Sequence, residues 1–203
     1  MEGKLRVGVI GCGEISSNHV LGYLNSARYE IVALADLSEQ AMHDFDKQFS
    51  EHDDYKPEHF NDAREMLEKS ELDVVSVGVW DMGHAPMTIA AAASGVKAIL
   101  CEKPMSDTTG SAADMMLVCR RNGVKLAIGH QRRFLPAYNL AKQMIGDGEI
   151  GEPRLITTAA RDGLPNYSSH LADMYRYLLG DPECVCDTGN VERETDQWAR
   201  AIP

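Results

Sequence analysis

Short apolar runs alternate with amphipathic stretches along the first two thirds of this chain. The runs that we expect to form buried strands cover residues 5–10, 29–35, 72–79, 96–100 and 124–129. Between them, apolar residues recur at helical spacing over residues 14–26, 38–49, 61–69, 84–94 and 107–121. Strands that alternate with helices in this way are typical of a parallel sheet. The pattern therefore predicts an α/β fold with a doubly wound parallel sheet.

Capping residues refine the helix boundaries. Ser38 and Asn61 stand where side chains that cap helix N-termini are expected. Pro86 is placed by this pattern in the first turn of its helix, and Gly95 at the end of it. Residues 50–60 are polar and predict a loop with one short strand.

Beyond Gly129 the alternation is less regular. The pattern there predicts a helix that ends near Gly146, a strand over residues 153–160, a helix over 168–179 and a strand over 184–188. We find no internal repeat and no low-complexity linker.

The turn after the first strand carries glycines at a spacing that suits a dinucleotide. It reads Gly11-Cys12-Gly13-Glu14-Ile15-Ser16, a GxGxxG-type turn with serine at the third small position. The first glycine permits a tight turn, the second lets the backbone approach a pyrophosphate, and the helix N-terminus offers free N–H groups. By itself this pattern also fits a glycine turn in any α/β protein.

The second strand ends in Asp36, 25 residues after Gly11. A carboxylate at this position accepts hydrogen bonds from the adenosine ribose hydroxyls and repels a 2′-phosphate. Together with the glycine turn it predicts a dinucleotide site that prefers NAD to NADP.

The strand over residues 96–100 leads into Cys101-Glu102-Lys103-Pro104. The end of a parallel strand is where open α/β sheets bind ligands, and Pro104 restricts the lysine before it. We therefore expect Lys103 to be aimed into a site. The alternative is an ordinary surface turn.

Composition narrows the classes of partner. The 203 residues are 44% hydrophobic and 25% charged, with a net charge of −11. This net negative charge gives no reason to expect nucleic acid or an anionic membrane as a partner. No apolar run approaches the roughly 20 residues that cross a bilayer, and we see no signal peptide.

The cysteines and histidines show no metal or disulfide framework. Five cysteines are an odd number and suit a reducing cytoplasm. Cys184 and Cys186 are interpreted as buried small hydrophobes. The seven histidines are scattered, so no metal site is expected.

Taken together, these motifs resemble the Gfo/Idh/MocA family of NAD(P)-dependent oxidoreductases, relatives of glucose–fructose oxidoreductase and inositol dehydrogenase. The matching segments are residues 11–15, Asp36, His84 with the alanine-rich helix after it, residues 101–104, residues 129–134, residues 170–173 and residues 178–180. The resemblance implies a Rossmann domain, residues 1–128, followed by a partial substrate and oligomerisation domain, residues 129–203. It also implies that the second domain holds an open, mainly antiparallel sheet, through which a homo-oligomer can form.

The resemblance implies hydride transfer between a nicotinamide and a secondary hydroxyl of a sugar, cyclitol or related polyol. It places Lys103 and His170 at the two catalytic positions. A neutral histidine is a suitable general base for a hydroxyl proton, and a lysine ammonium stabilises a developing alkoxide. The alternatives are a turn lysine and a packing histidine.

Further residues follow from the same resemblance. Those assigned to the cofactor are Gly11, Cys12, Gly13, Glu14, Ile15, Asp36, Trp80, His84 and Glu102. Those assigned to the substrate are Gln131, Arg133, Asn166 and Asp173. Asp173 lies one helical turn after His170 and could orient it, or it could serve as a cap or a surface ion pair. Arg133 could likewise hold a substrate hydroxyl or pair with an acid.

The chain departs from the family pattern in three places. Asn166 replaces an aspartate four residues before His170, so it brings no negative charge to stabilise an imidazolium. Val79-Trp80-Asp81 replaces the usual Thr-Pro-Asn; Trp80 could stack near the nicotinamide, close the pocket or be a packing aromatic. The second domain is also short. These departures leave two alternatives open, a catalytically silent dinucleotide-binding protein (a sensor or an assembly partner) and a truncated fragment.

Overall fold

The computed structural model describes residues 3–158 and 164–186, and the side chains of residues 164–167 are not described. Its centre is a six-stranded parallel sheet with strand order β3-β2-β1-β4-β5-β6. The strands are β1 (Leu5–Ile10), β2 (Tyr29–Ala35), β3 (Glu58–Phe60), β4 (Val74–Val77), β5 (Ala98–Cys101) and β6 (Lys125–Ile128). The predicted doubly wound sheet is confirmed.

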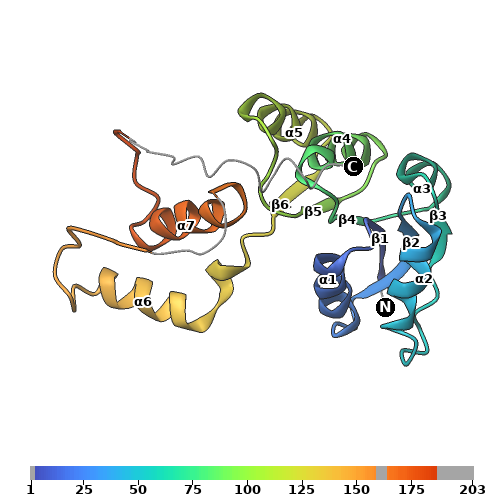
Figure 1. Cartoon of the computed structure of the whole chain (residues 1–203), viewed down its shortest axis with the longest axis horizontal. Helices are drawn as coiled ribbons and strands as arrows, with labels where there is room; N and C mark the ends of the chain where they lie inside the picture. Colours follow the sequence, from blue (N-terminus) through green and yellow to red (C-terminus); the bar gives the residue numbers. More distant parts are fainter. Residues whose placement is uncertain (1–2, 159–163, 187–203) are drawn as a thin grey trace, which may run out of the picture.

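Helices cover both faces of this sheet (Figure 1). One face carries α1 (Glu14–Leu24) and α2 (Glu39–Lys47), packed on Val7, Val9, Ile31 and Leu34. The other carries α3 (Ala63–Lys69), α4 (Asp81–Ala93) and α5 (Thr109–Arg121). Because the central strands β1 and β4 are largely buried on both faces, they read as nearly continuous apolar runs in the sequence.

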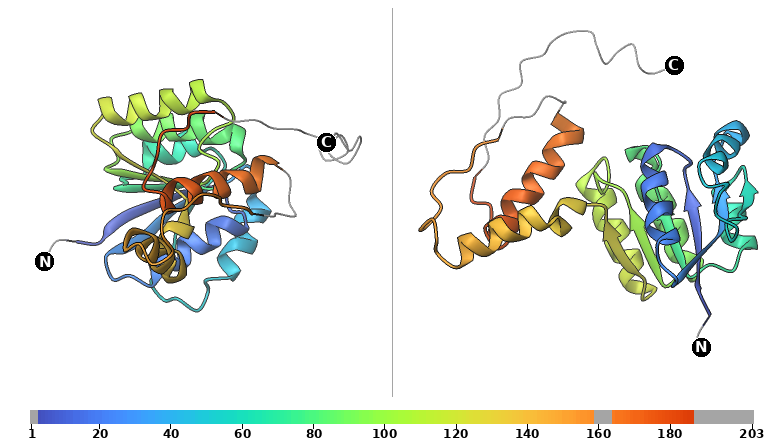
Figure 2. Two further views of the ribbon diagram at one scale, coloured as in Figure 1. Left: turned by 90° about the vertical axis from the view of Figure 1, so that its left-hand side faces the viewer. Right: turned by 90° about the horizontal axis from the view of Figure 1, so that it is seen from below.

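The chain then leaves the sheet beyond β6 (Figure 2). A short 3₁₀ helix, η1 (Gln131–Phe134), leads into α6 (Pro136–Gly146), and α7 (Leu164–Leu178) packs against both. The strand order reverses between β1 and β4, so the carboxyl ends of these strands flank the crevice in which doubly wound sheets bind ligands.

Several helix starts differ from the prediction. Ser38 caps α2 as expected, but Asp62 caps α3 in place of Asn61. Helix α4 begins at Asp81, so Pro86 lies inside the helix beyond the first turn. Helix α7 begins at Leu164, which places His170 in the middle of a helix.

The expected second sheet is not seen in the described part of the chain. Residues 153–158 and 184–186 form no strand, although both were predicted to begin one; residues 159–160 and 187–188 of these strands lie outside the described residues. Backbone groups of a strand need a partner strand, and none lies beside these segments in the described structure. Cys184 and Cys186 are exposed, so their interpretation as buried hydrophobes is wrong.

Candidate functional site

The glycine turn joins β1 to α1 at the carboxyl edge of the sheet. Gly11 has a φ of +92°, and a Cβ there would lie 2.6 Å from the carbonyl oxygen of Gly78. Gly13 precedes α1, and a Cβ there would meet open space. The backbone of this turn is therefore accessible to a ligand at the free N–H groups of α1, as a pyrophosphate requires.

The third small position packs the helix onto the sheet. Ser16 is fully buried, and a Cβ on Gly78 would overlap its Oγ atom. The predicted role of a small residue here, close helix–strand packing, matches this contact. Glu14 is exposed in the first turn of α1, and Ile15 is half-buried beside Gly78.

Asp36 lies at the end of β2, next to the glycine turn. Its Oδ2 accepts a hydrogen bond from the N–H of Cys12 at 2.8 Å, and its Oδ1 accepts one from the N–H of Ser38 at 2.9 Å. These bonds fix the carboxylate beside the turn and leave lone pairs for ribose hydroxyls. The residues present therefore fit the adenosine and pyrophosphate part of a dinucleotide.

Cys12 contributes its backbone and not its thiol to this arrangement. Burial raises the pKa of its thiol to about 12, and the charges of Asp36 and Asp46 add to the effect. The side chain is thus an uncharged thiol near neutral pH.

Trp80 and His84 stand at the start of α4 and differ in exposure. Trp80 precedes the helix and is 89% exposed, so it is not packed within the described structure, and its contact with a nicotinamide stays a prediction. His84 is 2% exposed; its Nδ1 lies 2.7 Å from the carbonyl oxygen of Pro104 and its Nε2 lies 2.9 Å from that of Val79. His84 therefore joins the end of β4 to the segment that carries Lys103.

Glu102 is buried where three segments meet. Its Oε2 accepts the N–H of Lys103 at 3.0 Å, and its Oε1 lies 3.1 Å from the Nε2 of His19 on α1. A Cβ on Gly129, just after β6, would overlap the carboxylate. Burial raises the pKa of Glu102, but the hydrogen bonds from His19 and Lys103 and their charges outweigh it, and the pKa lies below its ordinary value.

His170 on α7 is close enough to Lys103, two residues after β5, for the lysine charge to act on its imidazole. His170 is 6% exposed, and its ring lies edge-on to that of His130, with centroids 6.0 Å apart. Burial lowers the pKa of His170, and the charges of Arg132, Lys103 and His130 lower it further, against the charge of Glu102. His170 is therefore neutral near pH 7, the state in which an imidazole accepts a proton.

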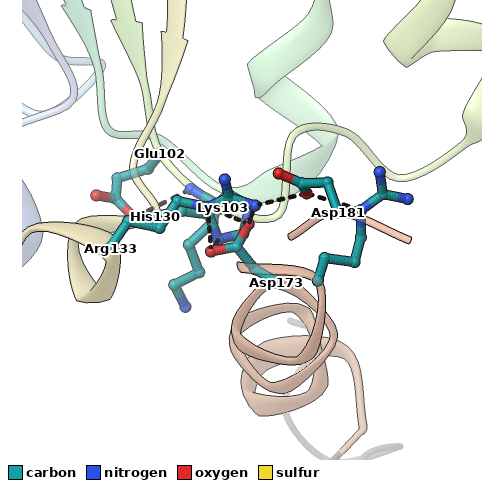
Figure 3. A network of polar contacts seen from close by, with 7 residues as sticks. Glu102, Lys103, His130, Arg133, Asp173 and Asp181 are labelled. Carbon is teal, nitrogen blue, oxygen red and sulfur yellow. Dashed lines mark hydrogen bonds and ion pairs between the residues drawn. The ribbon is translucent and has the colours of Figure 1, made fainter. Parts of the chain in front are cut away.

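Arg133 and Asp173 bind each other (Figure 3). The Nε of Arg133 lies 2.9 and 3.0 Å from the two carboxylate oxygens of Asp173, and its guanidinium also lies 3.4 Å from Asp181. This bidentate pair holds η1 against α7. Of the alternatives, the ion pair is present for both residues, and Asp173 also lies 3.8 Å from the Nδ1 of His130.

The remaining substrate assignments receive less support. Gln131 is exposed on η1. Asn166 lies on α7, but its side chain falls outside the described residues. Both assignments stay predictions.

The contacts of two further histidines of this region were missed by sequence reasoning. His19 points from α1 to Glu102, which is 83 residues away, and His130 packs on His170. Local patterns hold no signal for the first contact, because it depends on how α1 packs across the sheet. The position of His130 directly after the last strand was the available signal for the second.

The site is an open edge of the sheet. A cavity of about 700 Å³ lies at the other, amino end of the strands, lined by Lys4, Arg28, Asp73 and Lys97 among others, and contains none of the site residues. Within residues 3–158 and 164–186, no cluster of three metal-ligating side chains occurs and no helix is long and apolar enough to cross a bilayer.

A parallel sheet with a glycine turn after its first strand and an acid at the end of its second strand defines a dinucleotide-binding fold. Residues 5–130 match the family model of the Gfo/Idh/MocA oxidoreductases, described as an oxidoreductase family with an NAD-binding Rossmann fold. The chain belongs to this family.

Known relatives agree with the family. The chain is 29% identical over 195 residues to D-apiose dehydrogenase of Paraburkholderia graminis, a match that covers 88% of this chain and 50% of the relative. It is 27% identical over 192 residues to inositol 2-dehydrogenase of Burkholderia multivorans, covering 87% and 55% of the two chains. The chain thus spans about half the length of these curated relatives.

A solved structure supports the fold. The structure of apo scyllo-inositol dehydrogenase from Lactobacillus casei superposes with a TM-score of 0.79 at 20% identity, covering 89% of this chain and 56% of that chain. At this identity the likeness concerns the fold.

Proposed function

We propose that this chain binds NAD and takes part in hydride transfer between the nicotinamide and a secondary hydroxyl of a sugar, cyclitol or related polyol. The observation that carries the proposal is the glycine turn with the Asp36 carboxylate hydrogen-bonded beside it. The charge of Lys103, which follows β5, acts on the buried imidazole of His170. The names of two relatives, D-apiose dehydrogenase and inositol 2-dehydrogenase, support this substrate class.

In this proposal His170 and Lys103 both act on the oxygen atom of the substrate hydroxyl. His170, kept neutral by burial and by neighbouring positive charge, accepts the hydroxyl proton. The Lys103 ammonium donates a hydrogen bond to the same oxygen and stabilises the developing negative charge. NAD, when bound, supplies the acceptor for the hydride.

The cofactor preference follows from Asp36. Its carboxylate is held by two backbone N–H groups, so it cannot swing away from a 2′-phosphate without breaking both bonds. The proposal therefore favours NAD over NADP. Glu102, His84 and Trp80 complete the cofactor side, and Gln131, Arg133, Asn166 and Asp173 the substrate side.

The division into a Rossmann domain, residues 1–128, and a partial substrate domain, residues 129–203, is part of the same proposal. So are the cytoplasmic location expected from the cysteines and the homo-oligomer implied by the family.

A second candidate function is dinucleotide binding without turnover. The mutual pairing of Arg133 and Asp173 favours it, because both side chains already satisfy each other and are less available to a substrate.

Cofactor binding is tested by titrating the purified chain with NADH and NADPH and following fluorescence. We expect NADH to bind more tightly than NADPH. Asp36→Ser should weaken NADH binding and lower the ratio of the NADPH Kd to the NADH Kd by about tenfold or more, as the loss of one charge-assisted contact predicts. Failure of a folded sample to bind either cofactor would refute the proposal.

Turnover is tested on a panel of polyols and sugars with NAD. Lys103→Ala should lower kcat by at least about 100-fold, whereas Lys69→Ala, on the exposed side of α3, should leave it unchanged. Tight NADH binding with no turnover on any compound would favour the second candidate function.

A further inference from the structure

His19 is placed on the inner face of the helix that begins at the glycine turn. It lies five residues after Glu14, the first residue of α1, which is about 7–8 Å along the helix axis. Its side chain is 9% exposed, and the neighbouring Ser16 and Val20 are fully buried. The helix that offers its N-terminus to the phosphates therefore also points an imidazole into the sheet.

The partner of this imidazole is the carboxylate beside Lys103. The Nε2 of His19 lies 3.1 Å from the Oε1 of Glu102, whose side chain is 7% exposed. The other carboxylate oxygen accepts the N–H of Lys103 at 3.0 Å. One buried carboxylate thus joins α1 to the backbone of the lysine.

Packing alone does not account for a histidine here. A leucine at position 19 would fill the contact between α1 and the sheet, but it would leave the buried Glu102 carboxylate without the His19 donor. The Nδ1 of His19 is also buried, with no hydrogen-bond partner in the described part of the chain. What the histidine adds is a donor to a carboxylate that would otherwise have the N–H of Lys103 as its one hydrogen-bond donor among the described residues.

We propose that His19 is a positioning residue for the reaction: it donates to Glu102, and Glu102 holds the backbone of Lys103, so that the ammonium stays aligned with a cofactor bound at the start of α1. This inference rests on the proposed function. It assigns His19 no contact with the reacting atoms. Its effect passes through Glu102.

Three variants separate positioning from packing. His19→Leu removes the donor, His19→Gln keeps an N–H donor at similar reach, and Asn18→Ala removes an exposed polar side chain from the same helix as a control. We expect His19→Leu to lower kcat by roughly 10- to 100-fold with KM for the polyol changed less than about threefold, because misalignment acts on the transition state. His19→Gln should keep at least half of kcat, and Asn18→Ala all of it.

The alignment of Lys103 is measured separately, without turnover. Acetic anhydride labels lysine amines, and peptide mass spectrometry gives the labelling rate of Lys103 relative to Lys69 in the same sample. We expect this ratio to change at least threefold in His19→Leu and to stay within the wild-type range in Asn18→Ala. An unchanged ratio in a folded His19→Leu protein would overturn the proposal.

The two proposals fail in different ways. If the wild-type chain neither binds NADH nor turns over, the proposed function is wrong, while the labelling ratio still decides whether His19 positions Lys103. If the wild-type chain turns over and His19→Leu keeps kcat within twofold, the role of His19 is wrong and the function stands. If His19→Leu does not fold, the His19→Gln variant decides the question. A loss of kcat of tenfold or more in folded His19→Gln protein would contradict the role of His19.

Discussion

Gly78 is the residue on which the packing of the cofactor helix depends most directly. It follows β4, and a Cβ there would overlap the Oγ of Ser16 and lie 3.5 Å from both the Cβ of Ser16 and the Cγ2 of Ile15. The overlap thus involves one hydroxyl oxygen, whereas the other neighbours are at ordinary contact distance. Gly78→Ala should therefore push α1 outward unless that hydroxyl is removed.

The size of the destabilisation caused by Gly78→Ala follows from its contact with Ser16. Overpacking a buried contact by one carbon lowers the free energy of unfolding by about 1–3 kcal/mol. In a chain of this size, this corresponds to a fall in Tm of roughly 2–12 °C. The hydroxyl of Ser16 is buried without a hydrogen-bond partner among the described residues, so Ser16→Ala alone should be neutral or slightly stabilising.

The assay is a double-mutant cycle by urea unfolding, with NADH affinity measured on each variant. Gly78→Ala should lose stability and weaken NADH binding, because the N-terminus of α1 moves. The double variant Gly78→Ala with Ser16→Ala should recover most of both, with a coupling energy of about 1 kcal/mol or more. If the double variant is as unstable as Gly78→Ala, the assignment of the strain to that hydroxyl is wrong.

Three further predictions concern an ion pair, a histidine and a thiol. Arg133→Met should lower the free energy of unfolding by about 1–3 kcal/mol in urea denaturation, because it leaves the partly buried Asp173 without its bidentate partner; no loss would contradict this. Burial lowers the pKa of His170 below its ordinary 6.5, so the unfolded state binds more protons than the folded state as the pH falls. Stability should therefore decline below about pH 6.5, and His170→Gln should flatten the decline; an unchanged profile would count against it. With the Cys12 thiol at a pKa of about 12, iodoacetamide at pH 8 should alkylate the exposed Cys184 first, as mass spectrometry of peptides would show; equal rates would refute the assignment.

The parallel sheet could be predicted because its signals are local. The central strands β1, β2 and β4 are largely buried and read as apolar runs, and the glycine turn and Asp36 mark the ends of β1 and β2. The helix starts were less predictable. Trp80 precedes α4 with no side-chain cap, and Pro86 sits inside the helix, so rules based on capping residues placed the start too late.

Contacts between distant segments could not be predicted in the same way. The pairing of Arg133 with Asp173 and of His19 with Glu102 depends on the packing of α7 on η1 and of α1 across the sheet. The strand expected from residue 153 is an element that was predicted but is not formed by the described residues. Its composition suits a strand, yet Leu155 is 80% exposed, because a strand needs a neighbour that local sequence does not reveal.

The contact between Gly129 and Glu102 makes these two positions dependent on each other in evolution and in design. A methyl group at position 129 would lie 2.9 Å from the Cδ of Glu102, so alanine fits there only if the acid is shortened or removed. In a selection for folded variants with both positions randomised, alanine at 129 should appear with aspartate or serine at 102 and not with glutamate. A shorter acid at position 102 would in turn leave room for a side chain larger than that of glycine at position 129. Substitutions at positions 102 and 129 would therefore covary, although the two positions are 27 residues apart in the sequence.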